Sequence, residues 1–122
     1  MKIKIKTSTY WRTIRKYSNI AKNNYLWAQW GMMIEWYEKP WDTAAIALAY
    51  HDDDPVGSAI LLRDINFDAG VNYNFGVFVD QSYRRNGIGT NLVKGIQKRD
   101  NRQLFVDNVG SYRRLFYNQF GL

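Results

Sequence analysis

The sequence predicts a single α/β (α+β) domain in which helices flank a mixed central sheet. Three observations lead to this prediction. Short apolar runs rich in β-branched and aromatic residues alternate with segments whose apolar residues recur at helical spacing. Turn-forming residues separate these segments, and no internal repeat or linker interrupts them. The length of 122 residues suits one domain, residues 1–122, built around one hydrophobic core.

The first third of the chain is predicted to hold one strand and two helices. Residues 2–7 alternate polar and apolar side chains, as expected of a strand with one buried face. Residues 10–21 place apolar side chains at helical spacing, and Ser8 or Thr9 is available to cap this helix. A second helix is predicted at residues 26–37, before a proline.

Three strands are predicted next. Residues 43–50 and 56–63 are apolar runs separated by an Asp-rich, Pro-containing turn, which predicts a hairpin. Residues 73–79 form the third strand, and its last part is apolar enough for a strand that is covered on both faces. Gly76 inside it indicates either a β-bulge or the close approach of another backbone.

A helix, a strand and a last helix complete the predicted order. Ile88–Arg99 carries one apolar stripe at helical spacing. Residues 103–107 read as a strand, and residues 111–120 read as a helix. The whole order is β-α-α-β-β-β-α-β-α.

Composition excludes several classes of protein. No apolar run approaches the roughly 20 residues that span a bilayer, and the N-terminus alternates lysine and isoleucine where a signal peptide would be continuously apolar. We therefore expect a cytoplasmic protein without a membrane segment. Cysteine is absent, and the lone His51 cannot supply a multi-histidine metal site, so no metal is expected. The aspartates that follow His51 predict a solvated hairpin tip.

The charges are unevenly distributed along the chain. The net charge is +6, and residues 1–34 carry lysine and arginine but no acid. The middle of the chain is acidic, and basic residues return from Arg84 onward. An anionic cofactor would explain part of this second basic block, and nucleic acid is a candidate partner for the excess.

A basic, glycine-containing turn joins the third predicted strand of this group to the following helix. Gly87 and Gly89 permit a positive φ or the close approach of a ligand. The N–H groups at the start of the helix carry partial positive charge, so the junction predicts a phosphate site. A dinucleotide fingerprint is excluded because Leu92 stands where a third glycine is needed, and no Gly-Lys-Ser/Thr closes a P-loop.

Residues 84–89, Arg-Arg-Asn-Gly-Ile-Gly, resemble the (Gln/Arg)-x-x-Gly-x-(Gly/Ala) signature of the GNAT superfamily of acyl-coenzyme A dependent N-acetyltransferases. A hydrophobic strand precedes this stretch and an amphipathic helix follows it, as in the family. Residues 116–122 are similar to the aromatic-Tyr-x-x-(Phe/Leu)-Gly-(Phe/Leu) run that closes a later helix of the family. The predicted order of elements is that of the GNAT fold up to its fourth helix.

The resemblance implies acetyl-coenzyme A (acetyl-CoA) as the cofactor. In the family the pantetheine arm lies along the strand before the loop, and the pyrophosphate lies over the loop. The cofactor-binding residues implied here are Phe78, Val79, Arg84, Arg85, Asn86, Gly87, Ile88, Gly89 and Thr90.

The resemblance also implies the chemistry. Tyr117 matches the usual general acid, which donates a proton to the departing thiolate. Without a cysteine, the acetyl group should pass directly to an amine acceptor, either a small molecule or a protein. The acidic middle favours a cationic acceptor. Asp68 is the expected proton acceptor, and four other carboxylates stay open: Glu35, Glu38, Asp64 and Asp80.

The sequence departs from the family at its end. The family usually continues with two further strands, so we expect a shorter sheet or one completed by a second chain, and a homodimer is one hypothesis. The alternative function is a GNAT-like fold without activity that serves as a nucleic-acid-binding or protein-interaction module. A combination, in which the acceptor is carried on nucleic acid, also stays open.

Overall fold

The structure is a computed structural model that describes residues 2–26, 43–66 and 70–99. Its elements follow the predicted order wherever they are described. They are β1 (Ile3–Ser8), α1 (Trp11–Asn23), β2 (Thr43–His51), β3 (Asp54–Asn66), β4 (Gly70–Val79), the short 3-10 helix η2 (Gln81–Tyr83) and α3 (Ile88–Arg99). The elements predicted at residues 26–37, 103–107 and 111–120 lie outside the described residues. Neither described helix is long and apolar enough to cross a membrane.

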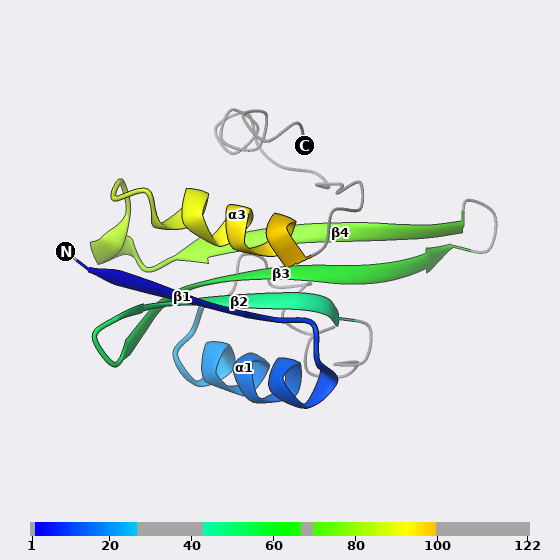
Figure 1. Ribbon diagram of the computed structural model, residues 1–122, viewed down its shortest axis with the longest axis horizontal. Coiled ribbons are helices and arrows are strands. Elements are labelled where there is room, and N and C mark those ends of the chain that lie inside the picture. The colour runs from blue at the N-terminus through cyan, green and yellow to red at the C-terminus, as the bar shows by residue number, and fades with distance from the viewer. Residues whose placement is uncertain (1, 27–42, 67–69, 100–122) are drawn as a thin grey trace.

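The described strands form one antiparallel sheet in the order β1-β2-β3-β4 (Figure 1). Strand β1 pairs with β2 from Ile3, opposite His51, to Ser8. Strands β3 and β4 form the longest ladder, which runs without a register shift and places Ile60 opposite Gly76. Gly76 therefore causes no bulge in this ladder, and that alternative was wrong. The strand predicted at residues 103–107 lies outside the described part of the sheet.

A β-bulge interrupts the pairing of β2 with β3 near their turn. Ala49 pairs with Gly57 and Tyr50 pairs with Pro55, so Val56 is an extra residue in β3. Val56 is buried, and it joins the core on the same side of the sheet as α3. A bulge bends the strand and increases its twist, and here it lies at the end of the sheet where the β2–β3 turn begins.

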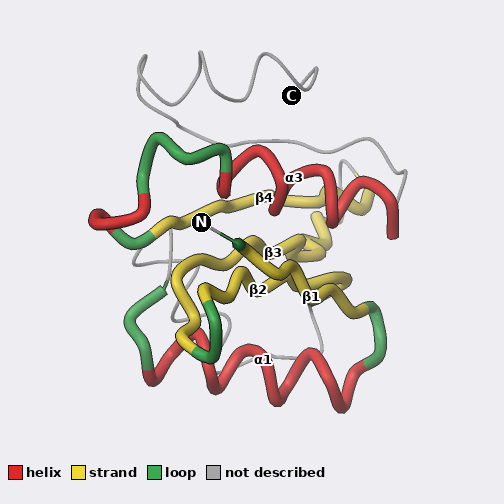
Figure 2. The backbone as a smooth tube through the Cα atoms, turned by 60° about the vertical axis from the view of Figure 1, so that its left-hand side comes forward, coloured by secondary structure: helices red, strands yellow, loops and turns green. Residues whose placement is uncertain are grey.

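The two helices cover opposite faces of the sheet, which gives three layers (Figure 2). Alternate residues of β2 serve the two layers, because successive side chains of a strand point to opposite faces. Ala45, Ala47 and Ala49 belong to the core beneath α3, whereas Ile46 and Leu48 belong to the core beneath α1. In the last part of β4, Val77 and Val79 contact the α3 side and Phe78 contacts the α1 side. This confirms a strand that is covered on both faces.

The start of α1 differs from the expectation. Its N-cap is Tyr10, which makes no side-chain capping hydrogen bond, so neither Ser8 nor Thr9 caps the helix. The reason is that the helix begins at Trp11, so Thr9 lies one position and Ser8 two positions before the N-cap. The hydroxyl of Ser8 instead accepts a hydrogen bond from the backbone N–H of Tyr10 at 3.0 Å.

Helix α3 lies close to the sheet because small residues face it. A Cβ atom at Gly57 in β3 would stand 3.0 Å from the carbonyl oxygen of Phe78 and 3.1 Å from Cδ1 of Leu92. A Cβ atom at Gly95 in α3 would stand 3.0 Å from Cγ2 of Thr7 in β1. All three separations are shorter than ordinary van der Waals contact. A side chain at either position would therefore displace its neighbours by a few tenths of an ångström, so glycine favours the present distance between α3 and the sheet.

Replacing Gly57 tests this packing. We expect Gly57→Val to lower the free energy of unfolding by about 1–3 kcal/mol, because the added atoms force α3 away from the sheet. The measurement is urea denaturation followed by circular dichroism. The control is Asn19→Ala on the exposed side of α1, which should change the free energy of unfolding by less than about 0.5 kcal/mol. A Gly57→Val protein as stable as the parent would show that the space beneath α3 is larger than the structure indicates.

Candidate functional site

The segment between β4 and α3 is anchored where it leaves the sheet. The backbone N–H of Asp80 donates to the carbonyl of Val56 at 2.8 Å, and this bond extends the β3–β4 pairing by one residue. The carboxylate of Asp80 accepts from the N–H of Ser82 at 3.0 Å, and its carbonyl accepts from the N–H of Tyr83 at 2.9 Å. Asp80 therefore caps η2, a structural contact that sequence analysis did not foresee for this carboxylate.

Two residues of the turn have left-handed backbone conformations. The φ angles are 68° at Arg85 and 75° at Gly87, a region that only glycine adopts without strain. The side-chain amide of Asn86 donates to the carbonyls of Tyr83 at 3.1 Å and Arg84 at 3.2 Å. These bonds fold the chain back on itself, so Asn86 supports the turn in a way that its residue type alone did not reveal.

The turn delivers the chain into the start of α3. The N–H of Asn91 donates to the carbonyl of Gly87 at 3.1 Å, which closes the first turn of the helix. The preceding N–H groups, those of Ile88, Gly89 and Thr90, have no acceptor inside a helix and carry its positive partial charge. Gly89 belongs to this first helical turn, so the positive φ that the sequence allowed at both glycines is found at Gly87. The arrangement is suited to an anion.

Arg84 connects the turn to the end of β4. Its Nε donates to the carbonyl of Val79 at 3.0 Å, and its guanidinium carbon lies 5.6 Å from the centre of the Phe78 ring. The carbonyl oxygen of Val79 has a second lone pair, so it can still accept from a ligand. Arg84 thus supports the site as well as adding positive charge, whereas exposed Arg85 is placed to add charge alone.

A second contact ties the turn to the β2–β3 hairpin. Nδ1 of His51 lies 2.9 Å from the hydroxyl of Tyr83, and the two rings meet edge to face at 5.4 Å. Asp52 and Asp53 form the exposed turn, which confirms the predicted hairpin tip. His51 itself is only partly exposed and takes part in the support of the loop. Sequence reasoning missed this pair because nothing in the sequence links two residues 32 positions apart.

The remaining backbone feature is the edge that β4 forms in the described sheet. Among the described strands β4 pairs with β3 alone, so it lies at one edge of that part of the sheet. An edge strand presents N–H and C=O groups that an extended chain can pair with. Phe78 and Val79 lie on this edge, directly before the anion-binding turn. The described edge of β4 and the turn are therefore adjacent, and their backbone groups suit an extended ligand and an anion.

Two predicted site residues cannot be compared with the structure. Tyr117 and Asp68, the expected catalytic pair, lie outside the described residues. Within residues 2–26, 43–66 and 70–99 there is no group of three or more histidine, aspartate or glutamate side chains that could hold a metal ion.

Comparison with known families identifies the class. The model of the acetyltransferase (GNAT) family matches residues 10–121, which is nearly the whole chain. The protein belongs to this family, and the strand, turn and helix described above are the part of the fold that carries its signature. A search of curated proteins gives no significant match.

Solved structures share the fold at low sequence identity. The aminoglycoside N-acetyltransferase AAC(6')-Iy, in complex with CoA, is 16% identical, with a TM-score of 0.65 over 99% of this chain and 88% of that chain. Glucosamine-6-phosphate N-acetyltransferase from Arabidopsis thaliana is 12% identical, with a TM-score of 0.63 over 100% and 92%. An acetyltransferase from Trypanosoma brucei is 17% identical, with a TM-score of 0.62 over 99% and 92%. These likenesses establish the fold.

The two left-handed residues give a matched pair of predictions. We expect Gly87→Ala to lower the free energy of unfolding by about 1–2 kcal/mol, because a Cβ atom is strained at its φ of 75° although it would meet no atom within 4 Å. We expect Arg85→Gly to change it by less than about 0.5 kcal/mol or to raise it, since glycine relieves the same strain. Thermal unfolding measures both, and a Gly87→Ala protein as stable as the parent would contradict the described turn.

Proposed function

We propose that this protein transfers an acetyl group from acetyl-CoA directly to an amine acceptor. The observation that carries the proposal is the anion-binding turn between β4 and α3 in a chain of the GNAT family. One neighbouring structure was solved with CoA and another with a bisubstrate analogue of CoA, which supports acyl-CoA as the donor.

The described residues fit the donor. The N–H groups of Ile88, Gly89 and Thr90, together with the backbone of residues 85–87, would hold the pyrophosphate. Arg85 would add a charge-assisted contact. The backbone groups of Phe78 and Val79 would pair with the pantetheine arm, and the Val79 carbonyl would share its oxygen between that arm and Arg84.

The reaction needs two proton transfers. The thioester of acetyl-CoA supplies an electrophilic carbon, to which the amine nitrogen bonds as the carbon–sulfur bond breaks. We assign to Tyr117 the donation of a proton to the departing sulfur, and to Asp68, directly or through water, the acceptance of the proton from the amine. Tyr117 is assigned from its position in the family's motif. Asp68 is assigned from its place in the sequence shortly before β4.

The acceptor class follows from charge. The acidic middle of the sequence favours a cationic amine. Two of the similar structures are aminoglycoside acetyltransferases, whose acceptors carry several amines. We therefore propose a cationic acceptor, either a polyamine-like small molecule or a lysine side chain of a protein.

Calorimetric titration with acetyl-CoA tests donor binding. We expect the parent protein to bind with micromolar affinity. The double variant Arg84→Ala, Gly87→Trp should lose at least about tenfold in affinity, because the indole covers the N–H groups and the hydrogen bond from Arg84 to the Val79 carbonyl is removed. Dephospho-CoA is the companion ligand, since it keeps the pyrophosphate and should still bind through the turn. Undetectable binding to the parent would sink the proposed function and leave the inactive binding module.

Replacing Tyr117 separates catalysis from binding. We expect Tyr117→Phe to reduce turnover about 100-fold or more, because the proton donor is lost, while the dissociation constant for acetyl-CoA changes less than about twofold. The measurement is release of the CoA thiol with a set of amine acceptors. Tyr112→Phe, on the same predicted helix, is the matched control and should keep its turnover. Unchanged turnover in Tyr117→Phe would remove this residue from the mechanism.

A further inference from the structure

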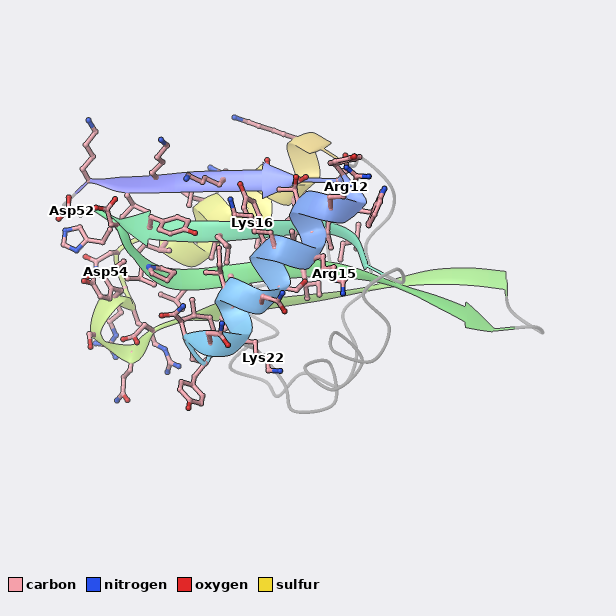
Figure 3. The ribbon with its side chains drawn as sticks, turned by 90° about the horizontal axis from the view of Figure 1, so that it is seen from below. Arg12, Arg15, Lys16, Lys22, Asp52 and Asp54 are labelled. Atoms are coloured by element: carbon pink, nitrogen blue, oxygen red, sulfur yellow. The ribbon has the colours of Figure 1, made fainter. Side chains whose placement is uncertain are left out.

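Helix α1 displays a row of cations on the side turned away from the sheet. Ile14, Ser18 and Ala21 are buried, at 2%, 4% and 0% exposure, and they fix which side of the helix faces the core. The exposed side carries four basic residues at helical spacing (Figure 3), namely Arg12, Arg15, Lys16 and Lys22. The apolar stripe is fully used in the fold, and the cationic stripe is left to solvent.

Strand β1 extends this charged surface. Ile3 and Ile5 pack on the α3 side of the sheet, so the alternate residues Lys4 and Lys6 lie on the α1 side. Nζ of Lys6 lies 5.1 Å above the ring of Tyr50, which itself packs into the core beneath α1. Partial burial raises the pKa of the Tyr50 phenol, and the nearby Tyr17 raises it further, so Tyr50 is uncharged at neutral pH.

Acidic residues are absent from the stretch of sequence that forms this surface. Residues 2–26 contain no aspartate or glutamate. Among the described residues, Arg15 and Lys16 make no ion pair. The nearest acids in sequence among the described residues, Asp52 and Asp54, lie at the β2–β3 turn, at the end of the sheet (Figure 3). A polyanion that contacts α1 would therefore meet Arg15 and Lys16, which no ion pair neutralises in the described part of the chain.

Two exposed aromatic side chains stand at the start of α1. Tyr10 is 54% exposed and Trp11 is 58% exposed, and their ring centres are 6.2 Å apart. The guanidinium of Arg12 lies 5.1 Å from the centre of the Trp11 ring. Exposed aromatic rings beside cations are the pattern by which proteins hold single-stranded nucleic acid, since bases stack on the rings while cations contact the phosphates.

Two other anionic partners fit the surface less well. A membrane surface would require α1 to insert an apolar face, and that face is already buried against the sheet. An acidic protein segment would pair with the cations but would leave Tyr10 and Trp11 without a defined role. The juxtaposition of exposed rings and cations thus favours nucleic acid over both.

We propose that the α1 basic face, which consists of Lys4, Lys6, Tyr10, Trp11, Arg12, Arg15, Lys16 and Lys22, binds single-stranded nucleic acid. The cations contact phosphates and Trp11 stacks on a base. This surface uses no residue of the turn between β4 and α3, so it does not rest on the proposed acetyl transfer. It gives the protein a second ligand on the opposite side of the sheet from α3.

The test is fluorescence anisotropy of a labelled single-stranded RNA of about 20 nucleotides, titrated at several salt concentrations between about 50 and 200 mM. We expect a dissociation constant of about 1–100 μM near physiological salt. The double variant Arg15→Gln, Lys16→Gln should bind more weakly. Its slope of log K against log salt should become shallower by about 1.4, which is about 0.7 for each phosphate that is no longer neutralised.

Matched controls separate this face from overall charge. Lys94→Gln, Lys98→Gln removes two exposed cations from α3, on the other face, and should leave affinity and salt slope close to those of the parent. Trp11→Ala should weaken single-stranded RNA binding at least about fivefold and leave duplex RNA binding unaffected, since bases stack on the ring only when unpaired. Circular dichroism melting confirms that each variant is folded.

Three results would overturn the proposal. The first is that Lys94→Gln, Lys98→Gln weakens RNA binding as much as Arg15→Gln, Lys16→Gln does. The second is that the protein binds polyglutamate more tightly than RNA. The third is that it binds duplex RNA as tightly as single-stranded RNA and that Trp11→Ala changes neither affinity. All titrations are done without CoA. Loss of acetyl-CoA binding with intact RNA binding would count against the proposed acetyl transfer alone, and the reverse result would count against the α1 basic face alone.

Discussion

The close approach of α3 to the sheet is the constraint on which the rest of the site depends. It rests on small side chains, above all Gly57 beneath Leu92 and Gly95 beside Thr7. The buried Ile88, the first residue of α3, packs in the same core cluster as Val79 at the end of β4. The N–H groups that follow β4 are therefore held at a defined place by packing far from the turn itself.

The turn between β4 and α3 is then shaped by hydrogen bonds from side chains to its own backbone. Asp80 and Asn86 close the two bends, and Tyr83 is held from the neighbouring hairpin by His51. With the bends closed by side chains, the N–H groups at the start of α3 point outward with no acceptor inside the helix. A preorganised anion site binds with less loss of conformational entropy than a flexible glycine loop would.

Sequence patterns predicted most of the described fold but not the details that shape the site. The predicted start of α3 at Ile88 is confirmed, because the glycine turn before it marks where the helix begins. The bulge at Val56, where an extra residue in β3 shifts the side that the chain presents, was not predicted because no residue type announces a bulge. The contact of His51 with Tyr83 depends on this tertiary arrangement, so local sequence could not reveal it. The sequence singled out Gly87, and its positive φ agrees with the expected need for glycine in the turn, whereas Tyr117 and Asp68 stay predictions because they lie outside the described residues.

The lysines of β1 also affect how two copies of the protein can associate. β1 lies at the edge of the described sheet opposite β4, and Lys2, Lys4 and Lys6 occupy every second position along it. If the β1 edges of two copies paired antiparallel, lysines of both chains would face each other on one side of the joined sheet, with Cβ atoms about 5 Å apart. Like charges at that distance oppose the pairing, so this spacing protects an otherwise open edge from aggregation. Any homodimer of this protein is therefore favoured to form through another surface.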